Sequence, residues 1–414
     1  MTETYAYPPE VAATLRQQWP AHGVPLPPLA VLTGFVAGGF QASLLREEDR
    51  PVQCHLFLLP GPRPAEGLDQ TPLPPPEVTA AFQVLAFSEP RTYSAQELRR
   101  LSPTTQRVGT LLAVAAAPTG ELTIEGLVFA TRPWDSADTP HQTGLLPPTL
   151  FMQVAGPGRL AFFCGAQPVL VLQQGQVGDY GGHEFPTGWL SGFAQPEANP
   201  AGLGPDDAGV SFTRQLGSYC LRLCLARVRA LGHGGMLVLV PGPDAPRLVG
   251  PAGLLRPKYG VRDNDLGTRY RALLARLLAR STALGLADWL AYRLTTDGEL
   301  LQLRTELEQF ADLLADLMAV DGALALDKQF NVLGFGVEIA APAPPTPFVY
   351  RALDAEGTQR QAEAADSGGT RHRAAYRLCQ AEAGCQAIVV SQDGGIRLVR
   401  QQAGQVVFWN QLLL

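Results

Sequence analysis

Two arginines and a histidine stand at the start of a predicted helix, where positive side chains are least expected. The segment 368–384, GGTRHRAAYRLCQAEAG, opens with two glycines, continues with Thr370 as a helix N-cap and closes on a glycine stop. Arg371, His372 and Arg373 then fall in the first turn, where the helix dipole disfavours cations. A bound anion removes this conflict, because the free N–H groups of a helix start and the forked donors of arginine both bind phosphate. The alternative is that the three side chains extend into solvent.

A second segment, VDGALALD at 320–327, places a carboxylate beside an apolar strand. Asp321 falls where a long helical pattern gives way to the strand. Gly322 and Ala323 follow with almost no side chain, so a ligand can approach the backbone closely. A carboxylate in this position can hold a hard cation such as Mg²⁺ or Mn²⁺. The alternative is that Asp321 ends the preceding helix.

A third segment, VVSQDGG at 389–395, ends a buried strand on Ser391 and places Asp393 in a tight turn. By itself this is an ordinary hairpin. Together the three segments supply a cation-binding carboxylate, a phosphate cradle and a polar strand end, which are the groups needed for phosphoryl or nucleotidyl transfer. The sequence contains no GxxxxGK[ST], GxSxG or HExxH motif, so P-loop, esterase and metalloprotease chemistries are not supported.

The elements that must position these residues fall into two predicted domains, 1–200 and 210–414, joined by a Pro- and Gly-rich linker at 195–209. The first is expected to be a mostly β, α+β domain, and its helix at 94–103 begins with Ser94 and Glu97 at capping-box spacing. Its expected strands are 52–60, 78–87, 110–117, 121–130, 149–156, 159–165 and 168–177.

The second domain is expected to be α/β, with a mixed β-sheet flanked by helices. The expected helices are 211–231, 266–294, 298–319 and 371–383, and the expected strands are 234–242, 321–327, 331–340, 386–391, 395–399 and 405–410. The stretch from the Pro-rich segment at 341–347 to Gly369 is expected to be a long loop.

Composition limits the classes of function. Of 414 residues, 46% are apolar and 17% charged, which is typical of globular proteins, and the net charge of -6 gives no basic field for nucleic acid. No signal peptide or membrane-spanning segment is expected, and six cysteines without a CxxC pair favour reduced thiols in a cytoplasmic protein. Cys220 and Cys224 share a helical face and are expected to pack in the core. Only Lys258 and Lys328 are lysines, which we attribute to a GC-rich genome.

The motifs D-G-A at 321–323 and G-T-R-H-R at 369–373, with an I-V-V-S strand at 388–391, resemble the bacterial diadenylate cyclase domain. The resemblance is strongest over 321–400. The strand pattern at 234–242 fits the expected start of such a domain, and the N-terminal region is similar, more faintly, to the sensor-like regions placed ahead of these domains.

The resemblance implies that two ATP molecules, one on each protomer of a two-fold homodimer, are joined into cyclic di-AMP with release of pyrophosphate. It implies a catalytic set of Asp321, Arg371, His372 and Arg373, and a divalent Mg²⁺ or Mn²⁺ ion held by Asp321 and Asp393. The nucleotide would be bound by Gly322, Ala323, Leu324, Gly369, Thr370, Arg371, His372, Arg373 and Ser391.

Two departures from the family pattern separate the hypotheses. Val320 replaces a histidine found in some members, and Ser391, Gln392 and Asp393 stand where many members have Ser-Glu-Glu. The first hypothesis is an active diadenylate cyclase regulated by its N-terminal domain. The alternatives are a degenerate module that senses a nucleotide without turnover, and a related nucleotidyltransferase that makes another cyclic or linear product.

Overall fold

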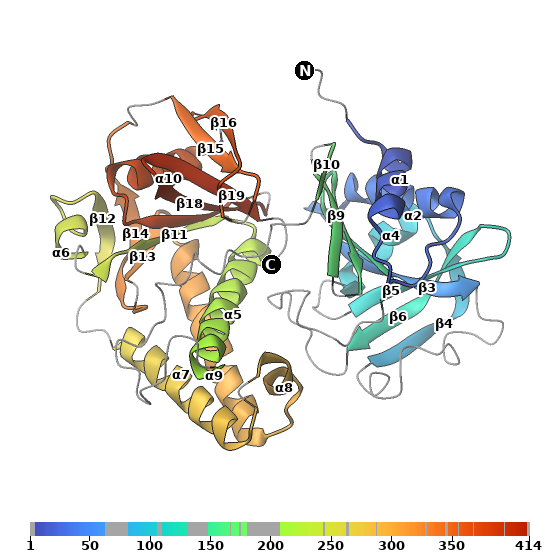
Figure 1. Ribbon diagram of the computed structural model, residues 1–414, viewed down its shortest axis with the longest axis horizontal. Coiled ribbons are helices and arrows are strands. Elements are labelled where there is room, and N and C mark those ends of the chain that lie inside the picture. The colour runs from blue at the N-terminus through green and yellow to red at the C-terminus, as the bar shows by residue number, and fades with distance from the viewer. Residues whose placement is uncertain are drawn as a thin grey trace. The chain divides into compact units, whose positions relative to one another are not determined.

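The chain divides into two compact units, Met1–Gly181 and Gly182–Leu414 (Figure 1). Both are mixed α and β: the first is rich in strands, and the second combines a large sheet with long helices, which confirms the predicted fold class. The computed structural model describes residues 5–62, 82–105, 110–130, 148–165, 167–173, 175–179, 208–242, 245–261, 265–286, 288–327, 329–343, 347–354, 356–366, 368–392 and 394–411. The predicted linker at 195–209 lies almost wholly outside these residues, so the domain boundary stays a prediction.

An eight-stranded sheet forms the body of the first unit, with the strand order β10-β9-β8-β7-β3-β5-β6-β4. Every neighbouring pair is antiparallel except β3 and β5. A separate two-stranded ribbon joins β1(Arg46–Glu47) and β2(Arg50–Pro51). The strands of the large sheet are β3(Cys54–Pro62), β4(Phe82–Thr92), β5(Thr110–Ala116), β6(Leu122–Ala130), β7(Leu150–Gly156), β8(Arg159–Cys164), β9(Gln167–Gln173) and β10(Gln176–Asp179).

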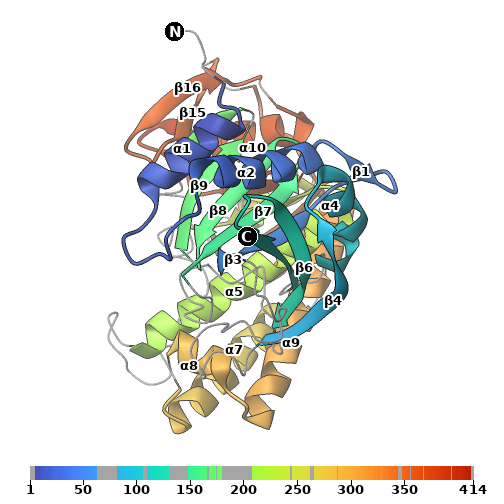
Figure 2. The same cartoon turned by 90° about the vertical axis from the view of Figure 1, so that its right-hand side faces the viewer.

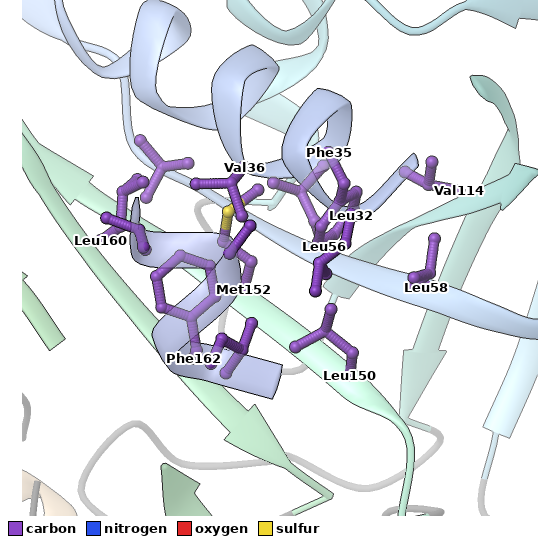
Figure 3. Packing of buried hydrophobic residues seen from close by; sticks show 14 of the residues in the cluster. Leu32, Phe35, Val36, Leu56, Leu58, Val114, Leu150, Met152, Leu160 and Phe162 are labelled. Atoms are coloured by element: carbon purple, nitrogen blue, oxygen red, sulfur yellow. The ribbon is translucent and has the colours of Figure 1, made fainter. Parts of the chain in front are cut away.

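Helices α1(Pro8–Gln18) and α2(Leu29–Ser43) cover one face of this sheet (Figure 2). Figure 3 shows the core between them and the strands, where Phe35 of α2 and Met152 of β7 are buried. The sequence analysis missed both helices. Two prolines open α1 at positions that tolerate them, and the glycines of α2, which disfavour an isolated helix, let Tyr93 and Met152 pack against its backbone.

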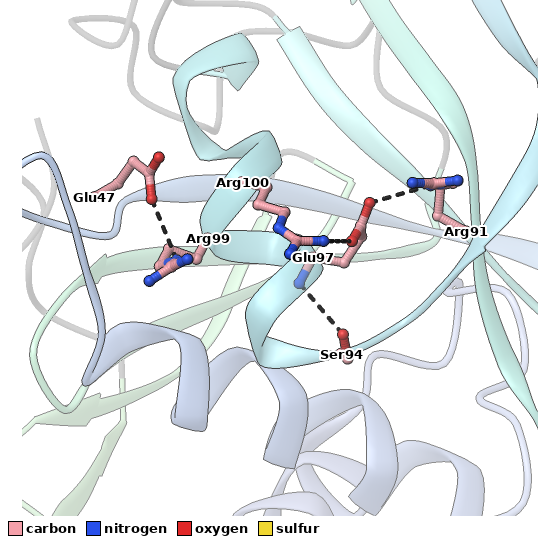
Figure 4. Close-up of polar contacts among 6 residues, drawn as sticks. All are labelled: Glu47, Arg91, Ser94, Glu97, Arg99 and Arg100. Atoms are coloured by element: carbon pink, nitrogen blue, oxygen red, sulfur yellow. Dashed lines mark hydrogen bonds and ion pairs between the residues drawn. The ribbon is translucent and has the colours of Figure 1, made fainter.

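The predicted helix at 94–103 is present as α4(Ala95–Leu101), followed by a 3₁₀ turn, η2(Ser102–Thr105). Ser94 caps it, accepting a hydrogen bond from the Glu97 backbone N–H at 3.3 Å (Figure 4). The Glu97 carboxylate contacts Arg91 at 3.1 Å and Arg100 at 3.3 Å. The cap is therefore confirmed, and the glutamate joins a small ion-pair network.

A nine-stranded mixed sheet forms the second unit, in the order β12-β14-β13-β11-β17-β18-β19-β15-β16. Strand β11, fourth in this order, runs parallel to β13 and antiparallel to β17. The strands are β11(Gly235–Val240), β12(Leu255–Gly260), β13(Ala323–Asp327), β14(Val332–Ile339), β15(Phe348–Ala352), β16(Arg360–Ala364), β17(Gln386–Val390), β18(Ile396–Gln402) and β19(Gln405–Gln411).

Helices cover both faces of this sheet (Figure 1). Helix α10(Thr370–Ala381) packs on one face over β17 and β18, and α5(Ala208–Leu231) and α9(Gly298–Ala319) contact strands from the other. The remaining helices are α6(Ala245–Leu248), α7(Leu266–Ala283) and α8(Trp289–Leu294). The single helix expected at 266–294 is thus two helices, interrupted after Ala283, where Gly285 adopts a positive φ of 67°.

Of two further expectations for the second unit, the structure corrects one and confirms the other. The long loop expected between 341 and 369 contains an antiparallel hairpin, β15 and β16, which extends the sheet through β19. The six cysteines are free and buried, and Cys224 Sγ lies 3.7 Å from Met318 Sδ in the interior. Burial raises the pKa of the Cys220 thiol, so this cysteine pair packs in the core as expected.

The turn that carries Gly322 requires a residue without a side chain. Its φ is 116°, and a Cβ placed there would lie 2.5 Å from the carbonyl carbon of Gly336 on β14. The sequence analysis related this glycine to a ligand. The structure shows that its first role is to let the turn pack directly against the β14 backbone.

Replacing Gly322 with alanine is expected to lower the free energy of unfolding by about 2–3 kcal/mol, because backbone strain adds to overpacking. Thermal or denaturant unfolding measures this loss. The control is Gly298→Ala at the first position of α9, where a Cβ meets nothing within 4 Å. Equal unfolding curves for both variants would contradict the packing role of Gly322.

Candidate functional site

The three candidate segments meet at one edge of the nine-stranded sheet. Because β11 and β13 are parallel, the residues just before each strand lie at the same edge. Strand β17 runs antiparallel to β11, with Gly235 opposite Val390, so the residues just after β17 lie there too. The edge therefore gathers the turn at 321–322, the turn at 233–234 and Ser391.

Asp321 does not end the preceding helix. Helix α9 stops at Ala319 with Val320 as its C-cap, and the Asp321 carboxylate instead accepts a hydrogen bond from Lys258 Nζ at 3.0 Å. Lys258 lies on β12 and also donates to the Asp321 carbonyl at 3.4 Å. The hydrogen bond and charge of Lys258, with a further contribution from the charge of Arg371, hold the pKa of Asp321 below its ordinary value of 3.8.

The start of α10 lies at the same edge and has no side-chain cap. Gly369, and not Thr370 as predicted, is the N-cap, so Thr370 is the first helical residue. The helix also ends at Ala381, before the predicted glycine stop. Without a capping side chain, the first N–H groups can serve an exposed anion, since Gly369 and Thr370 are exposed.

The two arginines of α10 make different contacts. Arg371 Nη1 donates to the His233 carbonyl at 3.4 Å, which ties the helix start to the turn before β11. Arg373 Nη1 donates to the Gly368 carbonyl at 3.2 Å. The His372 side chain packs against Gly368: a Cβ added to that glycine would lie 3.3 Å from His372 Cβ. All three side chains are half-buried and retain exposed surface at the site.

Ser391 closes the hairpin between β17 and β18. Its Oγ donates to the Gly395 carbonyl at 3.0 Å, and its backbone N–H donates to the same oxygen at 2.8 Å. The serine is half-buried, and the neighbouring Gln392 is exposed. Asp393, the predicted second metal ligand, lies outside the described residues.

Two predicted nucleotide contacts lie beneath the surface. Ala323 and Leu324 both have no exposed area, because they are the first residues of a strand covered on both faces. A ligand reaches Gly322 and Asp321 directly, whereas contact with Ala323 or Leu324 requires a local movement of the turn.

The residues of this edge fit a divalent cation only as part of a larger ligand set. Asp321 is ionised at neutral pH and its side chain is 89% exposed. Among the described residues, no three or more His, Cys, Asp or Glu side chains gather in a way that could hold a metal ion. A Mg²⁺ or Mn²⁺ ion bound by one carboxylate takes its other ligands from water and phosphate oxygens.

Lys258 and its strand neighbours were missed from the sequence. Tyr259 is exposed and stacks on Phe335 of β14, with ring centroids 4.9 Å apart. The available signal is the rarity of lysine in this chain, which has only Lys258 and Lys328. Placing Lys258 beside Asp321 requires the pairing of β12 with β14, which no motif predicted.

Residues 22–129 match the family model of a probable sensor domain, DACNV, and the match lies wholly within the first unit. No curated protein and no solved structure matches the chain. In the part of the chain that the structure describes, no helix has both the length and the apolar character needed to cross a bilayer.

Replacing Lys258 with methionine is expected to raise the pKa of Asp321 toward its ordinary value, more than Arg371→Ala does, because Lys258 supplies both a hydrogen bond and charge. Since the folded-state pKa is lowered, the ion pair stabilises the fold above the ordinary pKa and is lost as the pH falls through the lowered value. A ¹³C NMR titration, with Asp321→Asn for assignment, measures the shift. An unchanged Asp321 titration in Lys258→Met would contradict this geometry.

Proposed function

We propose that this protein is a diadenylate cyclase: it condenses two ATP molecules into cyclic di-AMP and releases two pyrophosphates, under control of its N-terminal sensor domain. The observation that carries the proposal is the meeting of Asp321, the uncapped start of α10 and Ser391 at one sheet edge. This edge combines one ionised carboxylate with donors suited to a polyphosphate.

Different side chains at the edge would bind the cation and the anion. Asp321 stays ionised at neutral pH and is exposed, so it can hold a divalent cation together with phosphate oxygens. The first N–H groups of α10, with Arg371, His372 and Arg373, would bind the triphosphate and neutralise charge on the departing pyrophosphate. When bound, the divalent ion would lower the pKa of the attacking hydroxyl.

The reaction needs two copies of this edge. In each of two steps, a ribose 3′-hydroxyl attacks the α-phosphorus of the other ATP, a phosphodiester bond forms, the bond to the β-phosphate breaks, and the hydroxyl proton passes to water. One protomer holds only one ATP. A two-fold dimer that brings the two edges face to face places each hydroxyl in line with the opposite α-phosphate.

The sensor match supports a regulated enzyme. The DACNV model covers 22–129, and this family is found in diadenylate cyclase-associated proteins. A sensor on the same chain as a signalling nucleotide cyclase gives a direct route from a detected signal to product. The proposal therefore assigns regulation to the first unit and chemistry to the second.

Purified full-length protein with ATP and Mn²⁺ or Mg²⁺ is expected to yield cyclic di-AMP, read by mass spectrometry. Asp321→Asn is expected to lower the rate by about 10²–10³-fold, because it removes the charge that holds the cation. Arg371→Ala is expected to weaken ATP binding about tenfold through one lost charge-assisted hydrogen bond. Arg377→Ala, an exposed arginine on the same helix, is the control and should change neither value.

The alternatives give different results in the same assay. ATP binding that depends on Arg371 without any product would identify a nucleotide-sensing module. A linear product, or preference for another nucleoside triphosphate, would identify a related nucleotidyltransferase. Equal product from wild type and Asp321→Asn would contradict the assignment of this edge as the active site.

The dimer requirement gives a separate kinetic expectation. Below the dissociation constant of the dimer, the rate per protomer should rise in proportion to protein concentration, because the active species is bimolecular. Sedimentation velocity with a non-reactive ATP analogue locates that concentration range. A specific activity that stays constant while sedimentation shows only monomer would contradict a two-protomer reaction.

A further inference from the structure

Lys258 is one of two cationic side chains that act on the Asp321 carboxylate. Its ammonium lies 3.0 Å from the Asp321 carboxylate, and the charge of Arg371 acts on the same group. One carboxylate is therefore in contact with the ammonium of β12 and is also affected by the charge of an arginine on α10. The resulting surplus of positive charge is directed at the edge where the proposed nucleotide binds.

The contact between Lys258 and Asp321 is easily broken. The lysine side chain is 52% exposed and the aspartate 89% exposed, and ion pairs of this kind contribute little to stability. Lysine carries a compact charge on a flexible stem, so its ammonium can move several ångströms without movement of the backbone. Strand β12 itself is held in place by its pairing with β14 and by the stacking of Tyr259 on Phe335.

A divalent cation bound to Asp321 repels the ammonium of Lys258, because two positive charges then lie at the same carboxylate. An ammonium released from Asp321 stays on β12 at the same edge, and phosphate oxygens are the acceptors that a bound nucleotide brings there. The strand thus holds a movable positive charge next to a site that requires charge neutralisation.

We propose that Lys258 is a phosphate-binding residue of this site: it rests on Asp321 when the site is empty and moves to the polyphosphate when a nucleotide binds. The inference rests on the proposed function, since it assumes that a nucleoside triphosphate occupies this edge. It adds to that function a residue from β12, which lies far in sequence from the three motifs.

The test is a double-mutant cycle on ATP affinity, measured by calorimetry in EDTA so that no turnover occurs. Wild type, Lys258→Met, Asp321→Asn and the double variant are compared. Asp321→Asn is expected to tighten ATP binding severalfold, because the competing carboxylate is gone. In that background Lys258→Met is expected to weaken binding about tenfold, the effect of one charge-assisted hydrogen bond, and less in the wild-type background.

The matched control is Arg256→Met, an exposed cation two residues earlier on the same strand and on the same side of it. It is expected to change ATP affinity less than twofold. Lys258→Gln is a second variant that keeps a polar side chain, and thermal unfolding of every variant verifies the fold. If Lys258 acted only by positioning Asp321, replacing Lys258 would no longer change ATP affinity once Asp321 is asparagine. If Lys258 binds phosphate, the loss of affinity persists in that background.

Unchanged ATP affinity for Lys258→Met and Lys258→Gln in the Asp321→Asn background would overturn this inference, while loss of binding in Arg371→Ala would leave the proposed function intact. Equal losses for Lys258→Met and Arg256→Met would also overturn it, because they would show a general field and no specific contact. A wild-type protein that does not bind ATP would overturn both proposals together.

Discussion

The hydrogen bonds that join β11 to β13 on one side and to β17 on the other hold the candidate site together. Strand direction decides which turns meet: β11 and β13 both begin at this edge, and the antiparallel strand β17 ends there. The strands are buried on both faces, with β11 fully buried along its length, so this arrangement has little freedom to shift. Asp321 and the start of α10 are attached to this fixed edge through a short turn and a helix start, and Lys258 reaches Asp321 from β12.

The edge carries an excess of positive charge around a single carboxylate. A helix start without a capping side chain contributes partial positive charge, and Arg371 and Lys258 add full charges. Such a concentration is unfavourable in an empty site and is relieved by the existing contacts to Asp321 and to the His233 carbonyl. A polyphosphate relieves it further, which is why an anionic ligand is the natural complement of this edge.

The first unit has a different construction. Its helices α1 and α2 lie on the sheet through a core that includes Leu32, Phe35 and Met152, and two glycines of α2 let large side chains approach its backbone closely. The match to a probable sensor domain covers α2 and the strands β3 to β6. The proposed function assigns sensing to this unit and chemistry to the second.

Sequence patterns predicted most of the regular elements and suggested a chemistry for the three motifs. The periodicity of α9 and the apolar runs of β11 and β17 are strong local signals, because a buried strand or an amphipathic helix must repeat its side chains at a defined spacing. Sequence patterns did not identify α1, α2 or β12, whose prolines, glycines and short length conceal them locally and which owe their stability to long-range packing.

The way in which distant residues meet depends on strand pairing and helix packing. Gly322 is required because β14 approaches its turn, and Lys258 reaches Asp321 because β12 pairs with β14. Neither relation can be derived from spacing along the chain, since both depend on which strands pair with β14 and in which register. Residue types therefore specified the chemistry that was possible, and strand pairing decided which of those residues act on the same group.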